Sequence, residues 1–261
     1  MTSEPTARKS LGQHWLRDKQ VLTDIVNYAE LTKSDTVLEI GPGTGTLTEI
    51  LIEKAGNIIV VELDEKLADQ LSKKFSSQKL QIIKANILEF DLKILPAGYK
   101  IVANLPYYLS GIFLRLISES ENPPSMAVLL LQKEVAQRIN AEPGQMSIQA
   151  VTTQFFWKVN LGRDVPAELF TPPPKVDSQV LILKRRNKQL YSDVEPDQFF
   201  RLVKMGFAQP RKTLLNNLSA SLRHSREETQ SVLDRASIEA GRRPQTLSLD
   251  EWRSLYQALH T

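Results

Sequence analysis

The chain has 261 residues, no cysteine and a formal net charge of +3, from 33 Lys and Arg against 30 Asp and Glu. Hydrophobic residues make up 41% of it and charged residues 24%, which predicts a sizeable core and excludes intrinsic disorder. The absence of cysteine excludes thiol catalysis, a disulfide scaffold and cysteine-ligated zinc, and it fits a reducing compartment.

The sequence lacks the features of a secreted or membrane protein. No apolar segment follows its start, and no run approaches the roughly 18 apolar residues of a membrane span. We therefore expect a cytoplasmic protein with no membrane partner. The three histidines, at positions 14, 224 and 260, lack the spacing of metal ligands, so we expect no metal site.

The N-terminal two-thirds alternates short apolar runs with helical patterns. Strands are expected at residues 36–40, 57–62, 80–84, 100–103, 126–131 and 179–183. Helices are expected at residues 47–55, 64–75, 112–118 and 132–140. Strands rich in Val, Ile and Leu and separated by helices predict a buried, mostly parallel sheet. The expected fold is therefore α/β, a doubly wound Rossmann-like domain that binds its ligand at the carboxyl ends of the strands.

The pattern changes after residue 186. Helical stretches cover residues 197–207, 211–223, 226–235 and 249–259, and no strand is predicted there. We expect two domains, a ligand-binding domain at residues 1–185 and a small all-helical domain at residues 186–261.

The excess of positive charge lies in the second of these domains. Residues 186–261 hold 12 basic and 9 acidic side chains, whereas residues 1–185 hold 21 of each. No acid occurs between Gln198 and Arg226. Such a stretch is either a solvated surface or a phosphate-binding one. The candidate phosphate contacts are Arg201, Lys204, Arg211 and Lys212.

A glycine loop follows the first predicted strand. Gly41, Gly43 and Gly45 let the backbone approach a ligand closely, ahead of a helix N-terminus. Glu62, at the end of the second strand, is placed to accept hydrogen bonds from a ribose diol. The pair predicts an adenosine-type cofactor, either a nicotinamide dinucleotide or S-adenosylmethionine. Thr46 breaks the dinucleotide fingerprint, and a merely structural turn remains the alternative.

The segment Asn104, Leu105, Pro106 and Tyr107 after the fourth strand favours one chemistry. An adenine amino group is a weak nucleophile, so an enzyme that methylates it must hold its two N–H groups with acceptors. The Asn104 side-chain carbonyl is one acceptor, and the Leu105 backbone carbonyl, extended ahead of proline, is the second. Tyr107 offers a ring on which the base can stack. The alternative is an ordinary proline-containing turn.

These motifs, taken together with others along the chain, resemble one family from about Arg8 to the C-terminal helices. The matching segments are Leu11–Leu16, Glu39–Gly43, Val61–Asp64, Asn104–Tyr107, Leu131–Ala136, Phe170–Ser178 and Gly206–Leu214. The family is that of the bacterial small-subunit ribosomal RNA adenine dimethyltransferases, the kasugamycin-sensitivity methyltransferases.

The resemblance implies S-adenosylmethionine as cofactor and two adjacent adenines near the 3′ end of small-subunit rRNA as substrate. Each adenine would receive two methyl groups, late in assembly, within a 30S intermediate, and the enzyme would act as a monomer. The implied cofactor-binding residues are His14 and Leu16 at the methionine end, Gly41, Glu62, Asn86 and Asn104. Tyr107 would stack on the target base, and Phe170 would cover it from the other side.

Three departures from the family pattern bear on this expectation. Asn86 stands where the family usually has Asp, Trp15 stands where it has Phe, and the loop at residues 141–147 lacks several residues. Asn86 keeps a carbonyl acceptor for the adenine of the cofactor, so we expect weakened binding and not its loss. The short loop puts RNA affinity and the order of methylation in doubt.

Three alternatives remain open. The antibiotic-resistance dimethyltransferases of 23S rRNA share the glycine loop and the Asn-apolar-Pro-aromatic element, although Phe170–Ser178 and Leu131–Ala136 favour the small-subunit branch. A non-catalytic ribosome-assembly factor would keep the fold as an RNA-binding platform. A nicotinamide oxidoreductase fits least well, because Asn104–Tyr107 would have no role in it.

Overall fold

The computed structural model describes residue 8 and residues 11–260. They form two compact units, one of residues up to 136 with 158–185, and one of residues 137–157 with 186 onward. The boundary expected at residues 185–186 coincides with one junction of this division. Residues 137–157, expected in the first domain, group with the helices of the second. Among the described helices, none combines the length and apolar character needed to cross a membrane.

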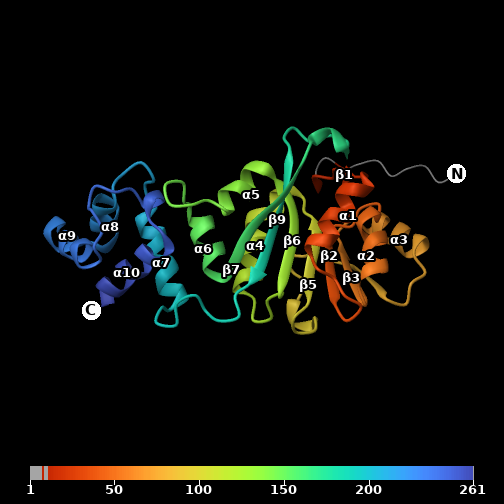
Figure 1. Ribbon diagram of the computed structural model, residues 1–261, viewed down its shortest axis with the longest axis horizontal. Helices are drawn as coiled ribbons and strands as arrows, with labels where there is room; N and C mark the ends of the chain where they lie inside the picture. Colours follow the sequence, from red (N-terminus) through yellow and green to blue (C-terminus); the bar gives the residue numbers. More distant parts are fainter. Residues whose placement is uncertain (1–7, 9–10, 261) are drawn as a thin grey trace. The chain divides into compact units, whose positions relative to one another are not determined.

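The first unit is built on a seven-stranded sheet in the order β4-β3-β2-β5-β6-β9-β7 (Figure 1). The strands are β2 Thr36–Ile40, β3 Asn57–Glu62, β4 Leu80–Lys84, β5 Lys100–Asn104, β6 Met126–Gln132, β7 Trp157–Val165 and β9 Ser178–Arg185. The first five in spatial order are parallel, and β9 runs antiparallel to β6. A two-stranded pair, β1 Trp15–Leu16 and β8 Phe170–Thr171, lies outside this sheet. The doubly wound α/β prediction is confirmed.

Both faces of the sheet are buried, as its continuous apolar strands predict. Val37, Val60 and Val128 belong to a core with the buried residues of α1 and α2, while their neighbours Leu38 and Leu129 are equally inaccessible. The helices of this unit are α1 Lys19–Tyr28, α2 Thr46–Lys54, α3 Glu65–Lys74 and α4 Ser110–Glu119, and α5 Lys133–Ile139 spans the junction.

The sequence pattern does not predict the short strands β1 and β8, nor helix α1, strand β7 and helix α6 Ile148–Phe156. Strand β7 closes the sheet at one edge, and its residues alternate between buried, half-buried and exposed. An edge strand carries polar residues that blur the apolar pattern, which explains why β7 was not recognised.

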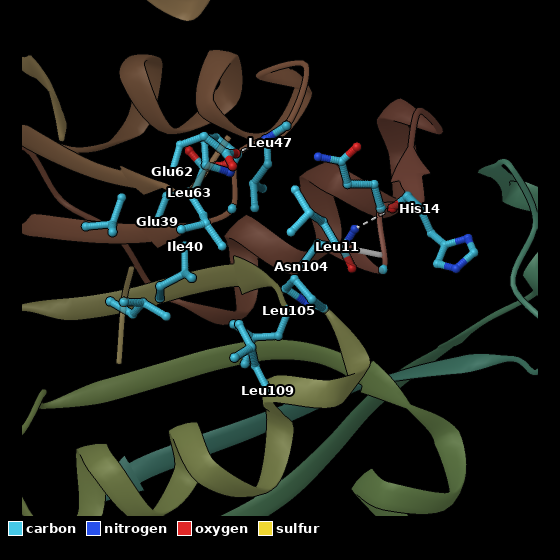
Figure 2. A pocket seen from close by; sticks show the side chains of 18 of the residues that line it. Leu11, His14, Glu39, Ile40, Leu47, Glu62, Leu63, Asn104, Leu105 and Leu109 are labelled. Atoms are coloured by element: carbon cyan, nitrogen blue, oxygen red, sulfur yellow. Dashed lines mark hydrogen bonds between the residues drawn. The ribbon is translucent and has the colours of Figure 1, made fainter. Parts of the chain in front are cut away.

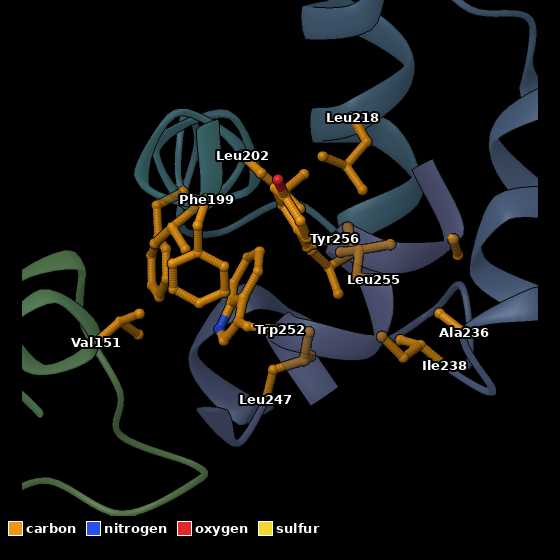
Figure 3. Close-up of a cluster of buried hydrophobic side chains, with 14 of the residues drawn as sticks. Val151, Phe199, Leu202, Leu218, Ala236, Ile238, Leu247, Trp252, Leu255 and Tyr256 are labelled. Atoms are coloured by element: carbon orange, nitrogen blue, oxygen red, sulfur yellow. The ribbon is translucent and has the colours of Figure 1, made fainter. Parts of the chain in front are cut away.

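The second unit is helical, as expected. Besides α6 it contains α7 Pro196–Gly206, α8 Leu214–Leu222, α9 Arg226–Arg235 and α10 Leu249–His260. Its core is aromatic, with Phe199, Trp252 and Tyr256 packed among aliphatic side chains (Figure 3). Helix α9 begins with a capping box in which Ser225 and Glu228 exchange side-chain and backbone hydrogen bonds.

Candidate active site

The predicted site residues meet at the carboxyl edge of the sheet (Figure 2). Strand order reverses between β2 and β5, and such a switch point opens a crevice beside the strand ends. The residues that line this cleft include His14, Leu16, Gly41, Glu62, Asn86, Asn104, Leu105, Pro106 and Tyr107. The structure therefore brings the residues expected at the cofactor and those of Asn104–Tyr107 together in one cleft.

The glycine loop after β2 has a backbone conformation that residues other than glycine rarely adopt. Gly41 and Gly43 have φ of 60° and 57°, in the left-handed region. A Cβ on Gly43 would also lie 2.9 Å from the indole of Trp15. Glycine at position 43 therefore lets the loop turn and lets Trp15 pack directly on it.

Glu62, at the end of β3, forms hydrogen bonds with the glycine loop and with the loop that follows β3. Its Oε2 accepts a hydrogen bond from Gly43 N at 3.2 Å and its Oε1 from Asp64 N at 2.9 Å. Burial raises the pKa of Glu62, and these two backbone bonds oppose the rise. A carboxylate oxygen has a second lone pair, so both oxygens can still accept from a ribose diol.

Glu39, the penultimate residue of β2, is a buried carboxyl group with 1% of its surface exposed. Thr48 Oγ1 donates to its Oε2 at 2.7 Å. Burial, aided by the negative charge of Glu62, raises the pKa of Glu39 to about 8, although the bond from Thr48 opposes this. The Glu39 side chain therefore enters the cleft as a mostly neutral acid at pH 7.

Asn104 is held by its amide nitrogen. Its Nδ2 donates to the His14 backbone carbonyl at 3.0 Å. A carbonyl oxygen can only accept, so this bond decides which end of the amide is the nitrogen. The Asn104 carbonyl oxygen is thereby left as an acceptor for a ligand, as the prediction requires.

Tyr107, in a short 3₁₀ turn after β5, is held by its hydroxyl. That hydroxyl shares a hydrogen bond of 2.8 Å with Ser178 Oγ, and Ser178 is fully buried at the start of β9. Burial raises the pKa of the Tyr107 hydroxyl, so the ring stays neutral. Its ring stacks with the ring of His14, with centroids 5.9 Å apart and planes at 21°.

Asn86 lines the cleft but also stabilises its own turn. Its Oδ1 accepts from Leu88 N at 3.1 Å, and its Nδ2 donates to Glu89 Oε1 at 2.9 Å. One lone pair of the Asn86 carbonyl remains for a ligand. The contact that the resemblance implies for this residue is therefore still possible, with a single neutral acceptor.

Phe170 was expected to cover the target base, but it is not among the residues that line the cleft. It is 2% exposed, pairs with Leu16 between β8 and β1, and belongs to the main core of the first unit. Burial of this apolar side chain in the core stabilises the fold more than an exposed position would.

Several residues that line the cleft are not predicted by the sequence motifs. Leu63 and Ile87 follow strand ends beside Glu62 and Asn86, and Leu63 is half-exposed, as expected of a surface that an adenine ring would cover. The Trp15 indole Nε1 is buried and has no hydrogen-bond partner among the described residues. An unpaired buried donor beside the cleft fits a ligand that carries oxygen acceptors. The exposed tyrosine at position 108 also lines the cleft.

The four candidate phosphate contacts lie in the helical unit and are all exposed. Arg201 and Lys204 are on α7, while Arg211 and Lys212 belong to the loop before α8, whose residues line a solvent-open hollow. No ion pair to any of the four is found within residues 11–260. Lys184 differs, because it pairs with Glu30 at 2.7 Å.

Comparison with known proteins identifies the family of this chain. The sequence pattern of the family described as ribosomal RNA adenine dimethylase matches residues 5–258. The ribosomal RNA small subunit methyltransferase A of Dehalococcoides mccartyi is 42% identical over 253 residues, which cover 95% of this chain and 87% of that protein. Its counterpart in Thermosynechococcus vestitus is 39% identical over 260 residues, which cover 97% of each chain.

Solved structures share the fold. A dimethyladenosine transferase from Plasmodium falciparum superposes with a TM-score of 0.81 at 24% identity, covering 93% of this chain and 96% of that one. The 23S rRNA methyltransferase ErmE superposes with a TM-score of 0.77 at 25% identity, covering 95% of this chain and all of that one. With its matching sequence pattern and relatives above 30% identity along nearly the whole chain, this protein belongs to the ribosomal RNA adenine dimethylase family.

Proposed function

We propose that this protein transfers methyl groups from S-adenosylmethionine to the exocyclic amino groups of two adjacent adenines near the 3′ end of small-subunit rRNA. Each adenine would be dimethylated within a 30S assembly intermediate, by a cytoplasmic monomer. The observation that carries the proposal is the Asn104 amide, which is held by the His14 carbonyl beside Tyr107 and in the same cleft as Glu62.

The cleft offers a surface for each part of the cofactor. Glu62 would accept from the ribose hydroxyls, the Gly41 loop would pass beneath the methionine part, and Asn86 would accept from the adenine amino group. Leu63 would cover one face of the adenine ring. When bound, S-adenosylmethionine supplies a methyl group on a positively charged sulfur, which is the electrophile of the reaction.

The adenine amino group that accepts the methyl group must be oriented, and it requires little acid or base catalysis. The Asn104 carbonyl oxygen and the Leu105 backbone carbonyl would accept the two N–H groups and turn the nitrogen lone pair toward the methyl group. Tyr107 would stack on the base and limit its motion. The methylated amine is acidic enough to lose its proton to water, so catalysis rests on positioning and electrostatics.

The exposed basic side chains of the helical unit would bind rRNA phosphates of the 30S particle. Replacing Arg201, Lys204, Arg211 and Lys212 by Gln should weaken binding to immature 30S particles and flatten its salt dependence by roughly 0.9 log units per lost phosphate contact. Cofactor affinity should stay within twofold. Particle binding over a salt series and calorimetric titration of the cofactor measure the two quantities, with Lys93→Gln, which breaks a surface ion pair of the first unit, as control. A parallel fall of both affinities would refute this division of labour.

The likeness to ErmE makes 23S rRNA the second candidate substrate. The deciding experiment incubates the protein and labelled cofactor with immature 30S particles and, separately, with 23S rRNA, and maps the methyl groups by mass spectrometry. We expect dimethyladenosine at two adjacent positions of the small-subunit rRNA and none in 23S rRNA. Labelling of 23S rRNA alone would overturn the assignment.

A further inference from the structure

The cleft is lined by carboxyl groups and by no lysine or arginine. Glu39 and Glu62, near the ends of the neighbouring strands β2 and β3, are its acidic side chains, and none of its described lining residues is Lys or Arg (Figure 2). The guanidinium of Arg8 is bound to Asp64, at 3.3 Å. Carboxyl groups without a basic partner favour a ligand that carries positive charge.

Glu39 has one oxygen that the protein leaves without a partner. The side chain is 1% exposed, and Thr48 Oγ1 donates to its Oε2 at 2.7 Å. In the described part of the chain no donor to Oε1 is found, so this oxygen carries the proton of the neutral acid. A buried carboxylate requires a nearby positive charge or further hydrogen bonds. A cationic ligand in the cleft would therefore favour ionisation of Glu39.

Few other groups of the protein set the charge of this carboxyl. The negative charge of Glu62 favours the neutral form of Glu39, while the hydroxyl of Thr48 on α2 favours the charged form. The remaining ionisable side chains that line the cleft are His14, Tyr107 and Tyr108. None of these three is among the groups that shift the pKa of Glu39. The charge of a bound ligand is therefore the main variable that can act on it.

We propose that Glu39 responds to the charge of the cofactor, releasing its proton when S-adenosylmethionine occupies the cleft and regaining one when methyl transfer leaves S-adenosylhomocysteine. This inference rests on the proposed function, since it concerns the same cofactor. The sulfonium and ammonium groups of the first ligand outweigh its carboxylate by one charge, whereas the second ligand has a neutral sulfur and no net charge. The electron pair of the broken S–C bond stays on sulfur. The methylated amine loses its proton to water and Glu39 takes one from water, so the protons balance.

The size of the effect follows from the pKa of Glu39, which burial raises to about 8. A positive charge within about 4–6 Å lowers the pKa of a carboxyl group by about 1–3. At pH 7, binding of S-adenosylmethionine should therefore release about 0.4–0.9 proton from Glu39, and binding of S-adenosylhomocysteine almost none. The ratio of the two affinities should rise about 5- to 50-fold in favour of S-adenosylmethionine between pH 6 and pH 8.

Calorimetric titration in two buffers of equal pH but different ionisation enthalpy counts the protons released on binding. Glu39→Gln removes the titrating group at nearly constant size, and Thr48→Val keeps the carboxyl but removes the donor that favours its charged form. Glu53→Gln, an exposed position on the same helix as Thr48, is the matched control. The amino group of each ligand is common to all variants, so subtraction of the Glu39→Gln value isolates the proton of Glu39. Thermal unfolding confirms that each variant is folded.

We expect the wild type and Glu53→Gln to release this proton with S-adenosylmethionine, and Glu39→Gln to lose both the release and the pH dependence of the affinity ratio. Thr48→Val should move the pH of maximal proton release upward. Equal proton release with the two ligands in the wild type would overturn the inference, and so would unchanged release in Glu39→Gln. Failure of the wild-type protein to bind S-adenosylmethionine at all would instead refute the proposed function.

Discussion

Asn104→Ala should lower the rate of methyl transfer by roughly 10²–10³-fold, the effect of removing one oriented hydrogen-bonding group from a transition state. The variant deletes the oxygen that would accept from the adenine amine. It also frees the His14 carbonyl, which now receives the Asn104 Nδ2 at 3.0 Å. Single-turnover transfer to 30S particles from labelled cofactor measures the loss.

Binding should survive this substitution. Asn104 contributes one group to a cleft with many lining residues, so cofactor affinity should fall less than tenfold and particle affinity should not change. Asn104→Asp is the matched variant, because it keeps the size but sets a carboxylate oxygen against the His14 carbonyl. We expect it to be as inactive as the alanine variant. A wild-type protein that binds particles without methylating them would favour the assembly-platform alternative, and full activity in Asn104→Ala would exclude the proposed role of this residue.

Glu39→Gln should remove a large pH dependence from stability. In the folded protein the pKa of Glu39 is about 8, against an ordinary value of 4.5. Above pH 4.5 the unfolded chain releases a proton that the folded chain still holds, so the free energy of unfolding falls as pH rises toward 8. The cost is about 3 kcal/mol at pH 7, an order-of-magnitude figure from the raised pKa. Glutamine does not titrate, so the contribution of position 39 to this decline should be absent in the variant.

Urea denaturation at pH 5 and pH 8 measures the effect. The stability lost between these two pH values should be smaller in Glu39→Gln than in the wild type by about 3 kcal/mol. Thr48→Val is the matched variant, because Thr48 donates to the Glu39 carboxyl and so favours its charged form. This variant should make the decline steeper. Parallel pH profiles for the wild type and Glu39→Gln would show that Glu39 is not held neutral.

The sequence predicted three of the parallel strands residue by residue. Strands β2, β3 and β4 have the predicted bounds, since each is a short segment rich in apolar residues between helical patterns. The glycine loop, Glu62 and Asn104 were also predicted to meet, because strands of a parallel sheet end at the same edge. These features depend on the local hydrophobic pattern and on the order of the strands along the chain, and both can be read from the sequence.

Other features depend on contacts between distant parts of the chain. The local pattern does not predict strand β7 and helix α6, and residues 137–157 group with helices that begin only at Pro196. Lys184 pairs with Glu30, which lies 154 residues away along the chain. A local sequence pattern does not predict which distant residue a side chain will contact in the folded chain.

The sequence by itself determined the fold class and the family motifs, because periodicity and spacing carry that information. Only the tertiary structure decided the neighbours of the segment Asn104–Tyr107. It placed Phe170 in the core and His14 beside Tyr107, although His14 and Pro172 are 158 residues apart along the chain. The reason is that burial and hydrogen-bond geometry are properties of the packed chain, in which each side chain competes for the positions that its neighbours leave.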